Sequence, residues 1–110
     1  MGNLYYGVVA TPVWMPDRLL AHLKVVISAK LRRNESFTIT WPHPAAEMWG
    51  STTIRVQPAI PMRFVFDEPE GEPLDATWLQ KLADASTRRG IVLHASDMTE
   101  SESEPTPDAV

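Results

Sequence analysis

The chain has 110 residues, of which 44% are hydrophobic and 22% are charged, and it contains no cysteine. This length predicts one domain with a single modest core, and the composition is typical of an ordinary globular protein. The lack of cysteine excludes disulfides, thiolate metal sites and thiol nucleophiles, and it agrees with the cytoplasmic location that we expect. No signal-peptide pattern opens the sequence and no apolar stretch reaches about 18 residues, so we expect no membrane span.

The net charge of −4 is unevenly spread along the chain. Residues 97–110 hold five of the fourteen acidic residues and none of the ten Lys and Arg residues, so residues 1–96 carry a net charge of +1. Segments this polar and charged do not pack, so we predict a single domain over 1–96 and a disordered acidic tail over 97–110. Within the domain, bases gather at 18–33 and acids at 67–75, which predicts a strongly dipolar surface.

The first third of the chain predicts a β-hairpin followed by an amphipathic helix. Residues 4–9 and 13–15 are apolar segments that flank a short turn. From Asp17, which suits an N-cap, apolar residues recur at helical spacing as far as the basic last turn, while His22 falls on the polar side. Asn34 suits a left-handed exit from this helix.

The rest of the chain predicts three strands, a second helix and a last short strand. Alternating apolar residues indicate strands at 37–41, 51–57 and 62–66, and their short connections favour an antiparallel meander. Asp75 then suits the N-cap of a helix, and Gly90 suits its C-terminal end.

These elements define an α+β fold, with an antiparallel sheet of five to six short strands and two helices in the order ββ-α-βββ-α-β. The inward faces of the predicted elements supply the core candidates. They are Leu4, Tyr6, Leu19, Leu23, Val26, Ile27, Phe37, Ile39, Trp41, Ile54, Val56, Phe64, Phe66, Trp78, Leu79, Leu82 and Val92.

The basic end of the first helix is one candidate binding surface. Lys24, Lys30, Arg32 and Arg33 could contact the phosphates of a nucleic acid. The alternative is that these bases complement the negative end of the helix dipole and bind no ligand.

The loop at 41–50 is a second candidate surface, because it is rich in aromatic and sulfur side chains where turn residues would suffice. Trp41, His43, Met48 and Trp49 are residue types that suit protein–protein contact. The alternative is that Trp41 ends a core strand and Trp49 folds back over the sheet edge.

Enzymatic chemistry finds little support in the sequence. His22, His43 and His94 are widely separated and form no metal-ligand spacing, so we predict neither a metal site nor a cofactor. The chain has no G-x-S-x-G motif and no glycine-rich phosphate loop. The acidic residues at 67–72 predict a solvated turn, since paired acid and base groups need a rigid and partly dry pocket.

A resemblance to a known family rests on five segments: GNLYYG, DRLLAHLKVVISAKLRRNESFTITW, PAIPMRFVF, LDATWLQKLADAS and GIVLHAS. Together, over residues 2–96, they resemble a family of small uncharacterised actinobacterial proteins. Members often carry the label "ATP-dependent DNA ligase", so the resemblance implies a link to nucleic-acid enzymes. Ligase adenylation uses a lysine in a K-x-D-G context. Neither Lys24, Lys30 nor Lys81 has this context, so we assign no catalytic residue.

The sequence therefore predicts a non-enzymatic interaction module that engages a protein partner, or a second copy of itself, through a sheet edge or the 41–50 loop. The alternative is a nucleic-acid-binding accessory protein that uses the basic end of the first helix.

Overall fold

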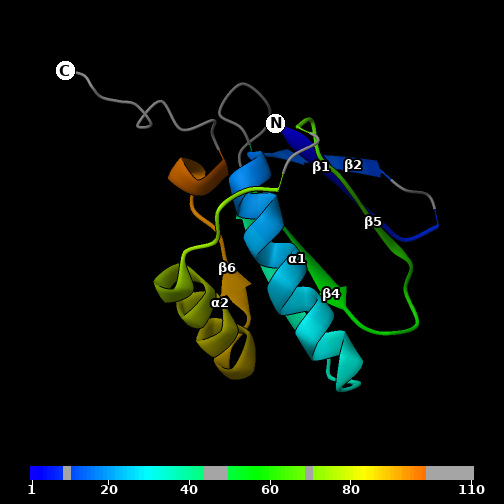
Figure 1. The fold of residues 1–110 in the computed structure, drawn as a ribbon. Helices are drawn as coiled ribbons and strands as arrows, with labels where there is room; N and C mark the ends of the chain where they lie inside the picture. The colour runs from blue at the N-terminus through cyan, green and yellow to red at the C-terminus, as the bar shows by residue number, and fades with distance from the viewer. Residues whose placement is uncertain (9–10, 44–49, 69–70, 99–110) are drawn as a thin grey trace.

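The computed structural model describes residues 1–8, 11–43, 50–68 and 71–98. Their helices and strands follow the predicted order (Figure 1). They are β1 (Gly2–Tyr6), β2 (Thr11–Met15), α1 (Asp17–Arg32), β3 (Phe37–Pro42), β4 (Ser51–Val56), β5 (Met62–Val65), α2 (Ala76–Arg88), β6 (Ile91–Val92) and the short 3₁₀ helix η1 (Ala95–Met98). The α+β class is confirmed.

The strands form two three-stranded sheets, in the orders β2-β1-β5 and β4-β3-β6. The predicted meander of β3, β4 and β5 is therefore wrong at its last step. β5 pairs antiparallel with β1, so that Leu4 lies opposite Phe64. The reason lies in the connection after β4, where Pro58 and Pro61 prevent a tight hairpin and the Pro61 carbonyl accepts a 2.9 Å hydrogen bond from the N–H of Gly7.

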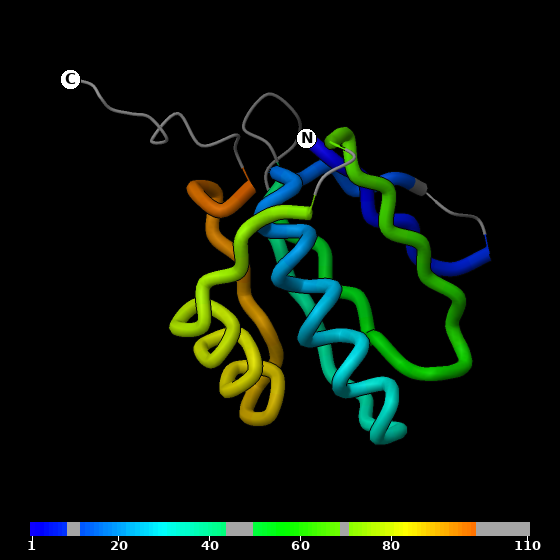
Figure 2. The backbone as a smooth tube through the Cα atoms, in the orientation of Figure 1, coloured from blue at the N-terminus to red at the C-terminus, as the bar shows by residue number. Residues whose placement is uncertain are grey.

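The second sheet also contains a parallel pair, which the sequence does not predict. β3 pairs antiparallel with β4 and parallel with β6, and Ile39 lies beside Ile91. The parallel pair follows from the helices, because α1 and α2 end at the same end of the molecule and each leads directly into its strand (Figure 1). This topology brings the two helices side by side (Figure 2).

The core lies between α1, α2 and the inward faces of the two sheets. Most predicted core residues are buried or pack against the core. Tyr6 and Val92 are the exceptions. Tyr6 is half-buried and does not belong to the core, and Val92 is 58% exposed while its neighbours Ile91 and Leu93 are 1% and 3% exposed. Strand side chains alternate between faces, and the pairing with Ile39 places Ile91 on the buried face.

The predicted helix ends are largely confirmed. The carboxylate of Asp75 accepts hydrogen bonds from the N–H groups of Thr77 and Trp78, and Asn34 has a φ of 62° after α1. The described fold continues to Met98, which packs on the core. Residues 99–110 of the predicted tail lie outside the described residues.

Candidate functional site

The structure accounts for two of the four candidate residues in the 41–50 loop. Trp41 is only 9% exposed and belongs to the core. His43 Nε2 lies 2.7 Å from the Thr52 hydroxyl, and the His43 N–H donates to the Gly50 carbonyl at 2.9 Å. Both residues thus stabilise the base of the loop. Met48 and Trp49 lie outside the described residues, so the contact role of the loop stays a prediction.

The four candidate bases on α1 are not equally available to a ligand. Lys30 is 7% exposed, and its ammonium donates to the Thr87 hydroxyl at 3.0 Å and pairs with Glu35 at 3.2 Å. It therefore connects α1 to α2. Arg33 also approaches Glu35, at 3.9 Å. Arg32 is exposed and Lys24 lies 5.7 Å from the centre of the Phe66 ring.

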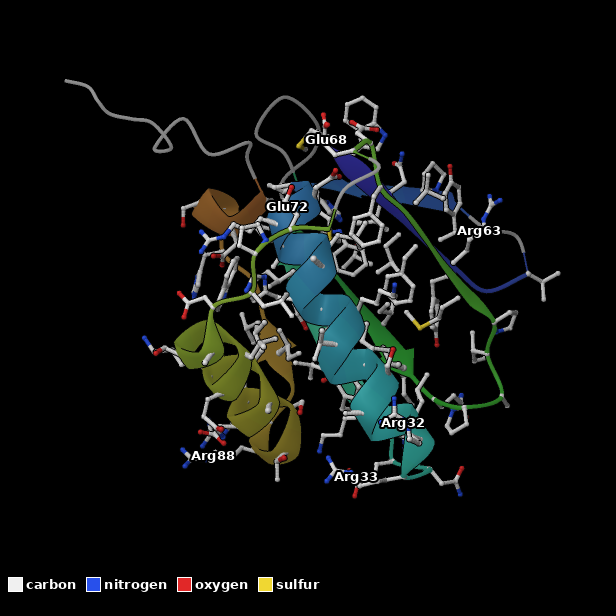
Figure 3. All side chains as sticks on the ribbon, in the orientation of Figure 1. Arg32, Arg33, Arg63, Glu68, Glu72 and Arg88 are labelled. Atoms are coloured by element: carbon white, nitrogen blue, oxygen red, sulfur yellow. The ribbon has the colours of Figure 1, made fainter. Side chains whose placement is uncertain are left out.

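Two further arginines enlarge the basic surface. Arg88 and Arg89 end α2 and are exposed, and the Lys30–Thr87 hydrogen bond places this end of α2 beside the end of α1. Figure 3 shows Arg88 at the same end of the helix pair as Arg32 and Arg33. Each helix end is visibly basic in the sequence, but only the parallel packing of the helices brings the two ends together.

The β2-β1-β5 sheet has an outer face that points away from the core, and sequence reasoning did not identify it as a surface. We call this the outer sheet face. Its members are Asn3, Tyr5, Pro12, Trp14, Arg63 and Val65. Trp14 is 66% exposed and Val65 is 38% exposed, and both lie opposite Asn3. The Arg63 guanidinium lies 4.4 Å from the centre of the Tyr5 ring.

Alternation along 13–15 could have located this face, because Val13 and Met15 point inward and Trp14 must then point outward. Within the described chain, the Oδ1 atom of Asn3 is buried and accepts no hydrogen bond. The centre of the outer sheet face therefore contains an unsatisfied acceptor beside an exposed tryptophan.

A groove of about 640 Å³ runs between α1 and the segment that follows β5. We call it the α1 groove. Its lining residues are Ala21, Lys24, Val25, Ser28, Ala29, Arg32, Phe66, Glu68, Gly71, Glu72 and Leu74. Residues 71–75 cross the first turns of α1 before α2 begins (Figure 2).

Two buried polar side chains of α1 hold that segment in place. Asp17, 5% exposed, is not the N-cap that the sequence predicts, because Pro16 takes that position. Its carboxylate instead accepts hydrogen bonds from the N–H groups of Asp67 at 3.1 Å and Glu68 at 3.0 Å. His22, expected on the polar side, is fully buried and accepts a hydrogen bond from the N–H of Asp75.

Within the described ranges, no group of three or more His, Cys, Asp or Glu side chains is placed to hold a metal ion. No helix in the described part of the chain is long and apolar enough to cross a membrane.

The comparisons with known proteins identify a family. The model of a domain of unknown function, DUF7882, matches residues 1–96. No curated protein and no solved structure matches the chain.

Proposed function

We propose that this chain, which belongs to the family of the domain of unknown function DUF7882, is a non-enzymatic interaction module that associates with a second copy of itself through the outer sheet face. The observation that carries the proposal is Trp14, which is 66% exposed on a regular strand. Trp, Tyr and Arg are the residue types enriched at binding hot spots, and all three occur on this face. A cytoplasmic location stays a prediction from the sequence.

The face is a better contact surface than the free edge of β2. Pro12 lies within β2 and has no N–H, so it weakens the strand as a template for edge pairing. The side chains of the face avoid this restriction, because face-to-face packing needs no backbone donor. We therefore propose the outer sheet face, and not the β2 edge, as the contact surface of this sheet; contact through another sheet edge stays a prediction from the sequence.

A second copy fits this face because the face carries little charge. Arg63 is the one charged residue among the six named members of the face, and its guanidinium already lies over Tyr5. Two copies can therefore meet without opposing clusters of like charge. Sheets pack face to face about 10 Å apart, and a two-fold axis makes such a contact self-complementary.

Light scattering over a concentration series tests the self-association. We expect the wild-type mass to rise toward that of a dimer, and Trp14→Ala and Val65→Asp to remain monomers. Val92→Asp is the matched control, since Val92 is a strand valine on the other sheet that is 58% exposed, more than Val65. A monomeric wild type at every concentration, or equal loss of dimer in Val92→Asp, would contradict the proposal.

We propose nucleic-acid binding as a second function, because Arg88 and Arg89 extend the basic surface that Arg32 and Arg33 begin. Binding to phosphates weakens steeply with salt, by a log–log slope of about −0.9 per contact on duplex DNA. We expect a mass shift with a short mixed-sequence duplex at low salt that disappears at higher salt. The double variant Arg32→Ala with Arg88→Ala should lose it, while Arg63→Ala should retain it. No shift at low salt would contradict this function.

A further inference from the structure

The floor of the α1 groove is apolar and reaches the solvent. Val25 and Leu74 are 40% and 52% exposed, and Phe66 also lines the groove. Val25 and Ala29 also line a second depression, between α1 and α2, of about 260 Å³. The apolar surface of α1 therefore continues from the α1 groove into this second depression.

The charges of the groove are separated along its length. Glu68 lies at the end where α1 begins, because its N–H donates to Asp17, and Glu72 follows it in the same segment. Arg32 is the last residue of α1, and Lys24 lies between the two ends. Figure 3 shows Glu68 and Glu72 at one end of α1 and Arg32 at the other. In the described part of the chain no ion pair joins these acids to these bases.

We propose that the α1 groove binds an amphipathic α-helix of another protein, with the partner helix antiparallel to α1. Its apolar stripe would cover Val25, Phe66 and Leu74. Its acidic residues would lie near Lys24 and Arg32, and its basic residues near Glu68 and Glu72. Helices commonly carry acids in their first turn and bases in their last, and this arrangement matches the groove only when the partner runs opposite to α1.

The length of the groove favours a helix over a small molecule. Its lining on α1 extends from Ala21 to Arg32, which is about 16 Å at the helical rise of 1.5 Å per residue. A partner helix of about three turns spans this distance. Small-molecule sites enclose most of their ligand, whereas this groove exposes its apolar floor. Apolar grooves of this kind are a common mode of helix recognition.

The described ends of the segment that follows β5 are anchored before a partner binds. Asp17 accepts from the N–H groups of Asp67 and Glu68, and His22 accepts from that of Asp75. Binding then costs less ordering of the segment. This inference does not depend on the outer sheet face, because that face points away from the core while the groove lies on the solvent side of α1.

A designed peptide of 14 residues is the probe, with one apolar stripe, glutamates in its first half and lysines in its second half. Two control peptides keep the stripe and carry only glutamates or only lysines. By fluorescence anisotropy, we expect the mixed peptide to bind about three- to tenfold more tightly than either control, from two to three exposed charge pairs. A spin label on its N-terminus should broaden the amide signals near Arg32 and not those near Glu68. Equal affinity for all three peptides, or broadening near Glu68, would overturn the proposal.

Variants locate the site independently of the peptide design. Val25→Glu should abolish binding, and Lys24→Glu with Arg32→Glu should shift the preference to the lysine peptide. Arg88→Glu is the matched control, because Arg88 is exposed at the same end but does not line the groove, and it should bind as wild type does. Trp14→Ala should also bind normally, which separates this site from the self-association surface. Loss of binding in Arg88→Glu would show a diffuse charge effect and overturn the inference.

Discussion

His22 on α1 accepts a 2.9 Å hydrogen bond at Nε2 from the backbone N–H of Asp75, the residue that caps α2. An N–H group can only donate, so Nε2 must be the acceptor and Nδ1 must carry the proton that is donated to the Arg18 carbonyl at 2.7 Å. The ring is fully buried and lies 4.4 Å from the ring of Trp78. One neutral histidine therefore joins the first turns of both helices.

We expect His22→Ala to lower the free energy of unfolding by about 3 kcal/mol, because it leaves a cavity and an unpaired N–H at Asp75. Urea denaturation measures the loss. His94→Ala is the control, since His94 is exposed and the change should cost less than about 0.5 kcal/mol. Equal stability of the two variants would show that His22 is not a structural link.

Asp17 anchors the start of the segment that follows β5, as His22 anchors the end of that segment at Asp75. Its buried carboxylate accepts from two N–H groups, and Asp17→Asn keeps one oxygen but loses the charge that strengthens both bonds. We expect a loss of about 1.5 kcal/mol in unfolding free energy. Faster hydrogen exchange at the Asp67 and Glu68 amides should accompany it. Asp84→Asn, on the exposed face of α2, should change neither quantity.

The sequence predicted features whose cause is local and missed those whose cause is long-range. The cap at Asp75 and the exit at Asn34 depend on a few neighbouring residues, and the structure confirms both. Asp17 looks like a cap for the same local reason. Its actual partners are 50 and 51 positions away in the chain, and no spacing rule could identify them.

The candidate sites follow the same division. Lys30 belongs to a basic cluster in the sequence, yet its partner Thr87 is reached only because α1 and α2 pack in parallel. Alternation with Val13 and Met15 is enough to place Trp14 outward, but Arg63 and Val65 join it on the outer sheet face only because β5 pairs with β1. Sheet pairing and helix direction are tertiary properties, and they decide which side chains share a surface.

Asn3 offers a test of stability on the outer sheet face. Its buried Oδ1 has no donor in the described residues, and an unsatisfied buried acceptor costs about 1–3 kcal/mol. We expect Asn3→Val to raise the unfolding free energy by about 1 kcal/mol, since valine also suits a strand. The melt should be run at low concentration, because the added apolar surface would strengthen self-association. A lower stability than wild type would show that the amide makes a needed contact.

Gly90 is a glycine at which a side chain should be poorly tolerated. It has a φ of 103°, and an added Cβ would clash with Oγ1 of Thr38 and lie 3.0 Å from the Thr38 carbonyl oxygen. α2 thus passes into β6 in direct contact with β3. We expect Gly90→Ala to lower the unfolding free energy by at least about 2 kcal/mol, from backbone strain and the clash together.

Gly71→Ala provides the matched comparison for Gly90. Nothing lies within 4 Å of a Cβ at Gly71, and its φ is outside the left-handed region. That change should be neutral or stabilising by up to about 1 kcal/mol, because alanine restricts the unfolded chain.

A second variant, Thr38→Ala, removes Oγ1 and should recover part of the Gly90→Ala loss in the double mutant. The strained φ and the Thr38 carbonyl remain, so recovery should be incomplete. Full recovery would assign the whole cost to the hydroxyl contact, and no recovery would assign it to the backbone.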